Sequence, residues 1–187
     1  EQIGVRHALL LADDDEDAEA LEAHEHGESP EDYVQRVTRL KLQAAIARHA
    51  ERRLPNAPIL CADTTVALGR RILGKPQDDA DAARTLALLA GRTHRVLTAV
   101  AVRRGRRSRL ALSVSKVHFK PLARAEIAAY VATGEPLKVA GAFTLDGRGS
   151  AYVSGITGDP HNVVGISVPL LRLMFDELGF VWHEFWV

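Results

Sequence analysis

Residues 58–68 read Pro-Ile-Leu-Cys-Ala-Asp-Thr-Thr-Val-Ala-Leu, two apolar runs separated by an acid and two threonines. A short apolar run such as residues 58–62 is typical of a strand buried in a sheet, and the strand pattern resumes at residues 66–68. A carboxylate inside an apolar strand is costly unless a cation or hydrogen-bond donors meet it. Asp63 is therefore a candidate functional residue within a predicted sheet.

Helices and further strands surround this stretch in an order that predicts an α/β fold. Ser29-Pro30-Glu31-Asp32 is a helix start, because serine can cap, proline suits the first helical position and an acid follows three residues after the serine. We expect that helix to run to about Arg52. Periodicity and closing glycines predict the other elements: strands at 6–11, 92–102 and 110–119, and helices at 79–90, 123–133 and 169–178.

Composition restricts the class of protein. The 187 residues are 47% hydrophobic, which fits one globular domain or two small lobes and excludes a disordered chain. Lys and Arg total 24 and so do Asp and Glu, so no overall field attracts nucleic acid or an anionic membrane. The single cysteine, Cys61, excludes a disulfide framework and paired-cysteine zinc sites, and no apolar stretch approaches the ~20 residues of a membrane span. We expect a cytoplasmic protein without a membrane partner.

Acidic residues are concentrated near the start of the chain. Eleven of the 24 acids lie between Asp13 and Asp32, and no Lys or Arg occurs between Arg6 and Arg36. A solvated face is the ordinary interpretation of such a run, and a divalent-metal or phosphate site is the sharper one. The sequence leaves both open.

Two lysines are candidates for anion binding. Lys41 lies about 40° from Val37 on a helical wheel, inside the apolar sector, where it either extends its ammonium to the edge of the core or directs it into a cleft. Lys75 stands between Gly74 and Pro76, on a stiff loop that suits phosphate recognition and also fits an ordinary turn.

Five arginines gather at residues 103–109, in a predicted hairpin. They could bind phosphate backbones, but charge at a hairpin tip also protects sheet edges from pairing. Because no aromatic residues are interleaved and no helix is available for a groove, we do not expect nucleic acid as a partner.

The acids and lysines together suit hydrolysis of a phosphoanhydride. Carboxylates hold divalent cations, a carboxylate activates water and lysines neutralise a polyphosphate. A serine, cysteine or zinc hydrolase fits less well, because the sequence has neither a nucleophile elbow nor zinc-ligand spacing.

Ordered motifs along nearly the whole chain resemble those of Maf proteins, which are nucleoside triphosphate pyrophosphatases also called septum formation inhibitors. The resemblance implies a fold like that of the inosine triphosphatases: a mixed, twisted sheet with flanking helices and a cleft between two lobes, often in a homodimer. The motifs are Pro30-Glu31-Asp32-Tyr33-Val34, Ala62-Asp63-Thr64, Ile72-Leu73-Gly74-Lys75-Pro76, Gly91-Arg92-Thr93-His94-Arg95-Val96, Gly134-Glu135-Pro136 and Ala140-Gly141-Ala142-Phe143.

The resemblance also implies a reaction and its residues. A nucleoside triphosphate is split into the monophosphate and pyrophosphate with Mg²⁺, Mn²⁺ or Co²⁺. Asp63 would accept the proton of the attacking water and bind metal, with Glu16 as a further metal-side carboxylate. Lys41 and Lys75 would be the phosphate ligands.

Substrate contacts are implied at Thr64, Arg92, His94 and Asp146. Thr64 and the Arg-Thr-His sequence resemble the residues found at these places in the branch of the family that acts on dTTP and UTP. Asp146 stands where that branch commonly has glutamine, and an anionic carboxylate would contact a base or a metal differently from an amide.

The family opens with a strand and a loop of the pattern Leu-Ala-Ser-x-Ser-Pro-Arg-Arg, and no such segment precedes Glu1 in this sequence. We therefore expect residues 1–187 to be a single Maf-like domain without its first strand and substrate-binding loop. Loss of that loop would lower or abolish activity, since neutralising the phosphates is the main electrostatic help available. The alternative function is a non-catalytic regulator of cell division that binds a nucleotide or a partner.

Overall fold

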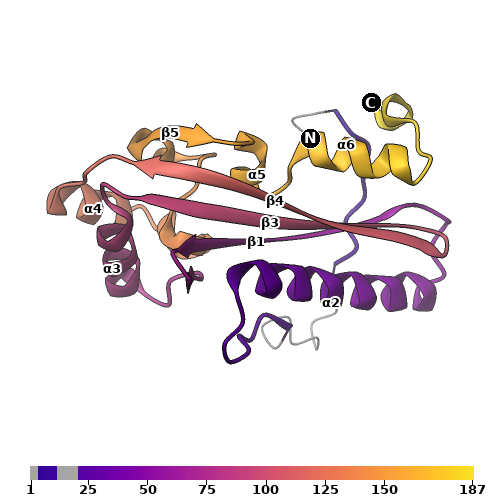
Figure 1. Ribbon diagram of the computed structural model, residues 1–187, viewed down its shortest axis with the longest axis horizontal. Coiled ribbons are helices and arrows are strands. Elements are labelled where there is room, and N and C mark those ends of the chain that lie inside the picture. The colour runs from indigo at the N-terminus through magenta and orange to yellow at the C-terminus, as the bar shows by residue number, and fades with distance from the viewer. Residues whose placement is uncertain (1–3, 12–20) are drawn as a thin grey trace.

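A five-stranded sheet forms the centre of the protein. The structure is a computed structural model that describes residues 4–11 and 21–187. The strand order is β2-β1-β3-β4-β5, and Figure 1 shows the long β3–β4 ribbon running along most of the molecule. The strands are β1 (Ile59–Leu68), β2 (Arg71–Leu73), β3 (Thr93–Arg104), β4 (Arg107–Phe119) and β5 (Val153–Thr157).

Helices cover both faces of this sheet. In Figure 1, α2 lies along one side of the strands and α6 along the other, while α3 and α4 lie at the opposite end from α6. The helices are α2 (Pro30–Glu51), α3 (Asp79–Leu89), α4 (Arg124–Val131), α5 (Pro160–Val164) and α6 (Val168–Glu177), with 3₁₀ turns η1 (Pro136–Lys138), η2 (Ala140–Ala142), η3 (Arg148–Tyr152) and η4 (Trp182–Phe185). Within the described ranges, none of the helices has the length and apolar character needed to cross a membrane.

The expected α/β class with flanking helices is confirmed. Where the resemblance implied a mixed sheet, the four pairings among the described strands are all antiparallel. The reason is local: two-residue turns connect β1 to β2 and β3 to β4, and such tight turns only join antiparallel neighbours.

Helix α2 forms as the sequence predicts. The Ser29 hydroxyl accepts a hydrogen bond from the Asp32 amide at 3.1 Å, which satisfies one of the free amides of the first turn. Tyr33, Val34 and Val37 are buried against the sheet, where they pack on residues of β1 and β3. The apolar stripe therefore positions this helix over the middle of β1.

Side chains of β1 alternate between the two faces of the sheet. Ala67 packs with the α2 residues, whereas Val66 belongs to the core cluster that includes residues of α3 and α4, and Ala62 packs against the α6 cluster. Since successive side chains of a strand point to opposite faces, Asp63 lies on the α2 face and Thr64 on the other.

The predicted break within 58–68 and the predicted strand at 6–11 are both wrong. Residues 59–68 form one continuous strand, because β3 pairs with it from Ile59 to Ala67. Near the N-terminus only Val5 forms a bridge, with Trp186, and residues 6–11 have no strand partner among the described residues. An apolar stretch becomes a strand only where a neighbouring edge is present to satisfy its backbone.

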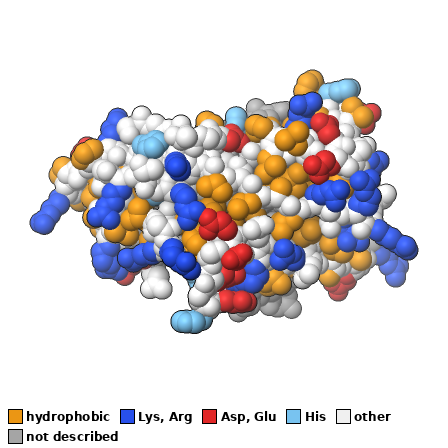
Figure 2. Space-filling view, viewed as in Figure 1, with side chains coloured by type: hydrophobic (Ala, Val, Ile, Leu, Met, Phe, Trp, Pro, Cys, Tyr) orange, Lys and Arg blue, Asp and Glu red, His pale blue; other side chains and the backbone are white. Residues whose placement is uncertain are grey.

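Three arginines of the β3–β4 hairpin hold the end of α6. Arg104 donates to the carbonyls of Leu178 and Gly179 at 2.7 and 2.6 Å, and Arg107 donates to the Glu177 carbonyl at 2.9 Å. Arg109 pairs with the Glu177 carboxylate at 3.0 Å. Figure 2 shows Lys and Arg side chains gathered at this end of the molecule. Arg104 and Arg107 therefore cap free carbonyls at the end of α6, and Arg109 holds the same end through an ion pair.

Candidate functional site

A pocket of about 150 Å³ lies at the β1 edge of the sheet. β2 pairs with β1 only from Val66 to Leu68, so the preceding residues of β1 reach the pocket. Four residues predicted from the sequence meet there. The lining consists of Glu22, Tyr33, Lys41, Asp63, Thr64, Thr65, Ile72, Gly74, Lys75 and Ala140.

Lys41 joins two carboxylates in this pocket. Its Nζ lies 2.5 Å from Asp63 Oδ1 and 2.7 Å from Glu22 Oε1. The Asp63 side chain is 11% exposed and the Lys41 side chain 28%. The ammonium is therefore directed into the pocket, which is the second of the two interpretations that the helical wheel left open.

Burial has the largest effect on the pKa of Asp63. Loss of solvent raises the pKa of this carboxyl above its ordinary value, although the hydrogen bond and charge of Lys41 act in the opposite direction. Burial lowers the pKa of Lys41, but its bonds to Asp63 and Glu22 outweigh that effect, so its pKa is raised. A carboxylate with a raised pKa is a stronger base near neutral pH, which suits proton abstraction from water.

The Lys75 loop closes the pocket from the side of η2. The Gly141 amide donates to the Gly74 carbonyl at 3.0 Å. Gly141 has φ +70°, and a Cβ there would lie 2.8 Å from Val66 Cγ2, so only glycine allows η2 to approach β1 this closely. This contact places Ala140 in the pocket wall next to the loop that carries Lys75.

Thr64 enters the pocket with its hydroxyl on the other face of β1. The Thr64 Oγ1 lies 2.8 Å from Thr98 Oγ1 in β3 and 3.4 Å from the carbonyl oxygen of Gly165. The lining therefore combines the charged Lys41 and Asp63 with an uncharged polar residue, Thr64.

Three predicted substrate contacts lie outside this lining. His94 is 1% exposed, and its ring packs against Phe119 and Phe143 with centroid distances of 5.0 and 5.1 Å. Arg92 is exposed and follows Gly91, whose φ of +68° ends α3. The Arg-Thr-His sequence thus has a structural reason, because it turns the chain from α3 into β3 and directs the histidine into the core.

Asp146 is exposed in the glycine-rich segment. That segment is held by Glu135, whose carboxylate accepts hydrogen bonds from the Tyr130 hydroxyl at 2.7 Å and from the amides of Arg148 and Gly149 at 3.1 Å. The substrate-binding roles of Arg92, His94 and Asp146 stay predictions that the pocket lining does not support.

Buried His94 predicts an acid-sensitive step in stability. Burial, with a smaller effect of His118, lowers its pKa to about 4, and neither ring nitrogen has a hydrogen-bond partner among the described residues. The unfolded chain then binds the extra proton between about pH 6.5 and 4, so stability falls as the pH falls through that window, by about 3 kcal/mol. We expect His94→Leu to flatten the dependence measured by urea unfolding. Exposed His26→Leu is the control, and an unchanged slope in His94→Leu would contradict this assignment.

The acidic stretch contributes Glu22 to the pocket, a residue that the sequence did not distinguish from its neighbours. The predicted metal-side carboxylate Glu16 lies outside the described residues. Within residues 4–11 and 21–187, no group of three or more His, Cys, Asp or Glu side chains could hold a metal ion by itself. Glu22 and Asp63 do supply two carboxylates to one pocket, and Mg²⁺ sites commonly use one or two carboxylates together with substrate phosphates.

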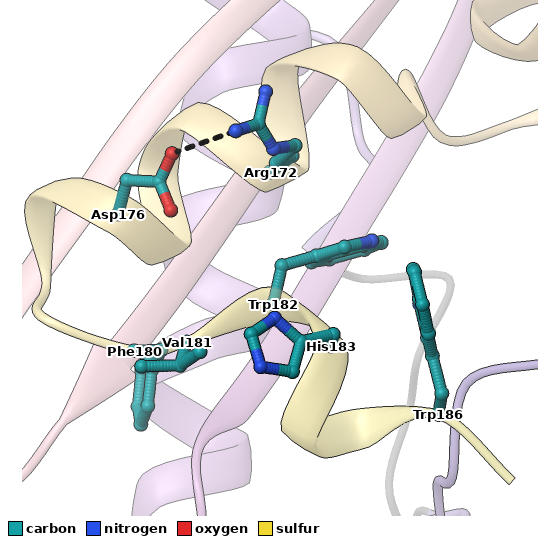
Figure 3. A pocket seen from close by; sticks show the side chains of 7 residues that line it. All are labelled: Arg172, Asp176, Phe180, Val181, Trp182, His183 and Trp186. Atoms are coloured by element: carbon teal, nitrogen blue, oxygen red, sulfur yellow. Dashed lines mark ion pairs between the residues drawn. The ribbon is translucent and has the colours of Figure 1, made fainter.

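A larger cavity of about 370 Å³ lies near the C-terminus. Figure 3 shows it between α6 and the segment of Trp182, His183 and Trp186, with the Arg172–Asp176 ion pair of 3.7 Å at one side. None of the residues predicted to act on substrate lines it. The smaller pocket is therefore the candidate active site, since it brings a buried acid and two lysines together.

Comparison with known proteins identifies the family of this chain. The sequence profile of the family described as Maf-like protein matches residues 1–178. A dTTP/UTP pyrophosphatase of Polaromonas sp. strain JS666 is 55% identical over 166 residues, which cover 89% of this chain and 82% of that protein. A dTTP/UTP pyrophosphatase of Cupriavidus metallidurans is 56% identical over 178 residues, covering 95% and 89%. The match over nearly the whole length means that this chain belongs to the Maf-like protein family.

Proposed function

We propose that this chain hydrolyses nucleoside triphosphates to nucleoside monophosphate and pyrophosphate, with a preference for dTTP and UTP. The observation that carries the proposal is the buried Asp63 carboxylate paired with Lys41 in a pocket that also contains Lys75. The names of the similar proteins from Polaromonas and Cupriavidus support the reaction and the two substrates.

In the proposed reaction, Asp63 accepts a proton from water as the water oxygen attacks the α-phosphorus. The bond from that phosphorus to the bridging oxygen breaks, and pyrophosphate leaves with the bonding electrons. Lys41 and Lys75 place positive charge beside the phosphates, where positioning and charge neutralisation supply most of the rate. The raised pKa of Asp63 favours the proton transfer.

A divalent cation, Mg²⁺, Mn²⁺ or Co²⁺, is proposed as the cofactor. Asp63 and Glu22 would hold it through their carboxylates, a donor set that suits a hard cation already bound to phosphate oxygens. When bound, the ion would neutralise charge on the triphosphate and polarise the phosphorus–oxygen bonds.

We further propose a cytoplasmic homodimer. The single cysteine, which fits a reducing compartment, supports the location, and the resemblance to the Maf family supports the assembly. Sedimentation equilibrium of the chain would measure its oligomeric state directly.

A panel of nucleoside triphosphates tests the activity. The intact protein encoded by the gene, with any residues that precede Glu1, is incubated with each triphosphate and Mn²⁺, and the products are separated by ion-exchange chromatography. We expect monophosphate and pyrophosphate in equal amounts, fastest from dTTP and UTP. Orthophosphate as the sole phosphate product would contradict the proposal, and tight nucleotide binding without turnover would favour the non-catalytic regulator.

A further inference from the structure

A buried threonine lies behind Thr64. Thr98 is 0% exposed, and its Oγ1 lies 2.9 Å from the carbonyl oxygen of Asn162 and 2.8 Å from Thr64 Oγ1. A hydroxyl has one proton to donate and two lone pairs. The three oxygens therefore form a short chain in which the direction of each hydrogen bond can be worked out.

The carbonyl of Asn162 determines where the Thr98 proton goes. The amides of Gly165 and Ile166 both donate to the His161 carbonyl, so they do not satisfy Asn162. If Thr98 donated to Thr64 instead, a buried carbonyl would lose its donor, which is unfavourable. Thr98 therefore donates to Asn162.

The position of Asn162 is itself well determined. Its side chain is fully buried, and Nδ2 donates to the Val96 carbonyl at 3.0 Å and to Ser115 Oγ at 3.2 Å. These bonds tie α5 to β3 and β4. The carbonyl that receives the Thr98 proton is thus held in place by the two longest strands of the sheet.

Thr64 must then use its own proton inside the protein. Its nearest acceptor is Thr98 Oγ1 at 2.8 Å, and the Gly165 carbonyl at 3.4 Å is the alternative. The Gly165 oxygen lies beyond the usual range of an O–H···O bond, so the Thr64 proton is directed at Thr98 Oγ1 and the remaining lone pairs of Thr64 are what this hydroxyl can offer to a ligand.

A hydroxyl that only accepts hydrogen bonds at Thr64 favours some groups of a nucleotide over others. Phosphate oxygens are acceptors too, so they are favoured at Lys41 and Lys75 and disfavoured at Thr64. The ribose hydroxyls of every nucleotide can donate to such an acceptor, so only a donor of the base can discriminate between substrates there. Thymine and uracil share an imide N3–H, whereas cytosine has an unprotonated N3 at the same position.

We propose that Thr98 is a positioning residue that fixes the Thr64 hydroxyl as the acceptor for the imide N3–H of uracil and thymine, and thereby disfavours cytosine. This inference rests on the proposed function, because it concerns the base of the same substrate. Thr98 is buried and acts through Thr64.

Selectivity between UTP and CTP tests the proposal. In Thr98→Val the Thr64 proton loses its nearest acceptor and can turn toward cytosine N3, so we expect the UTP/CTP ratio of kcat/KM to fall about tenfold, mainly through KM. Thr98→Ser keeps the hydroxyl and should retain the ratio. Thr38→Val is the matched control, since Thr38 is also fully buried and donates to the Val34 carbonyl at 2.7 Å in α2.

An unchanged ratio in folded Thr98→Val would overturn the proposal. The unaltered chain provides a second test that does not depend on how the variant folds. We expect it to use 3-methyl-UTP, which lacks the N3–H, at least about tenfold less efficiently than UTP. Equal use of both would also overturn the proposal.

Calorimetric binding of UMP and CMP separates this inference from the proposed function. If the chain prefers UMP in a Thr98-dependent way but cleaves no triphosphate, the inference stands and the proposed function fails. If it cleaves UTP and CTP with the same ratio in the unaltered chain and in Thr98→Val, the proposed function stands and the inference fails.

Discussion

Asp63→Asn is expected to lower kcat for pyrophosphate release from UTP by about 10³-fold, because an amide cannot accept the proton of the attacking water. Asparagine keeps the shape of the side chain and can still accept a hydrogen bond from Lys41, so the substrate-binding part of the pocket is retained. The loss should therefore appear in kcat and much less in KM. The rate is measured with a coupled assay for pyrophosphate under saturating UTP.

The same variant separates a catalytic from a structural role for this acid. Removing the carboxylate loses an ion pair, but it also removes the free-energy cost of burying a negative charge. Because these two effects on stability oppose each other, the melting temperature should change by only a few degrees. Asp79→Asn, an exposed acid at the start of α3, is the matched control and should keep full activity. Activity of Asp63→Asn close to that of the control would show that another group is the base.

Lys41→Met is expected to lower kcat/KM by about 10²-fold or more, because the pocket loses a positive charge that faces the phosphates. The substitution also leaves Asp63 and Glu22 without their shared cation. The pKa of Asp63 then rises further, since the bond and charge of Lys41 are the largest effects that oppose burial, with a smaller one from the charge of Lys75. Because the base must be ionised, the acidic limb of the pH–rate profile should move to higher pH.

Stability gives a second readout for this lysine. An unpaired buried carboxylate is unfavourable, so we expect a loss of about 2 kcal/mol at neutral pH, reduced by the partial exposure of the pair. Protonation of Asp63 removes the unpaired charge, so the loss should shrink as the pH falls through its pKa. Lys116→Met, an exposed lysine of β4, is the control. An unshifted acidic limb in Lys41→Met would mean that Lys41 does not act on the base.

Much of the site could be predicted from the chemistry of single residues. Asp63 stands out because an acid interrupts an apolar strand, and Lys41 because a lysine falls within the apolar sector of a helix. Both signals are local mismatches between a residue and its element, and the structure brings the two side chains together at 2.5 Å. Such mismatches mark places where a second group from elsewhere in the chain must compensate.

Other parts of the site had no local signal. Glu22 is one of eleven acids in a single stretch, and only its contact with Lys41 Nζ at 2.7 Å distinguishes it. His94 illustrates the reverse case: its motif predicts a substrate contact, whereas its position in β3 directs the ring between Phe119 and Phe143. Which face of a strand meets solvent depends on what packs on the sheet.

By itself, the sequence determined the helices α2, α3, α4 and α6, the long strand pair, the acid–lysine chemistry and, through its ordered motifs, the family. These depend on periodicity, capping and residue type, which act over a few neighbouring positions. Only the tertiary structure decided that Thr64, Thr98 and the Asn162 carbonyl form a chain of hydrogen bonds and that Glu22 pairs with Lys41. Those contacts link residues 19 to 64 positions apart, and their geometry follows from the strand register and helix packing of the whole sheet.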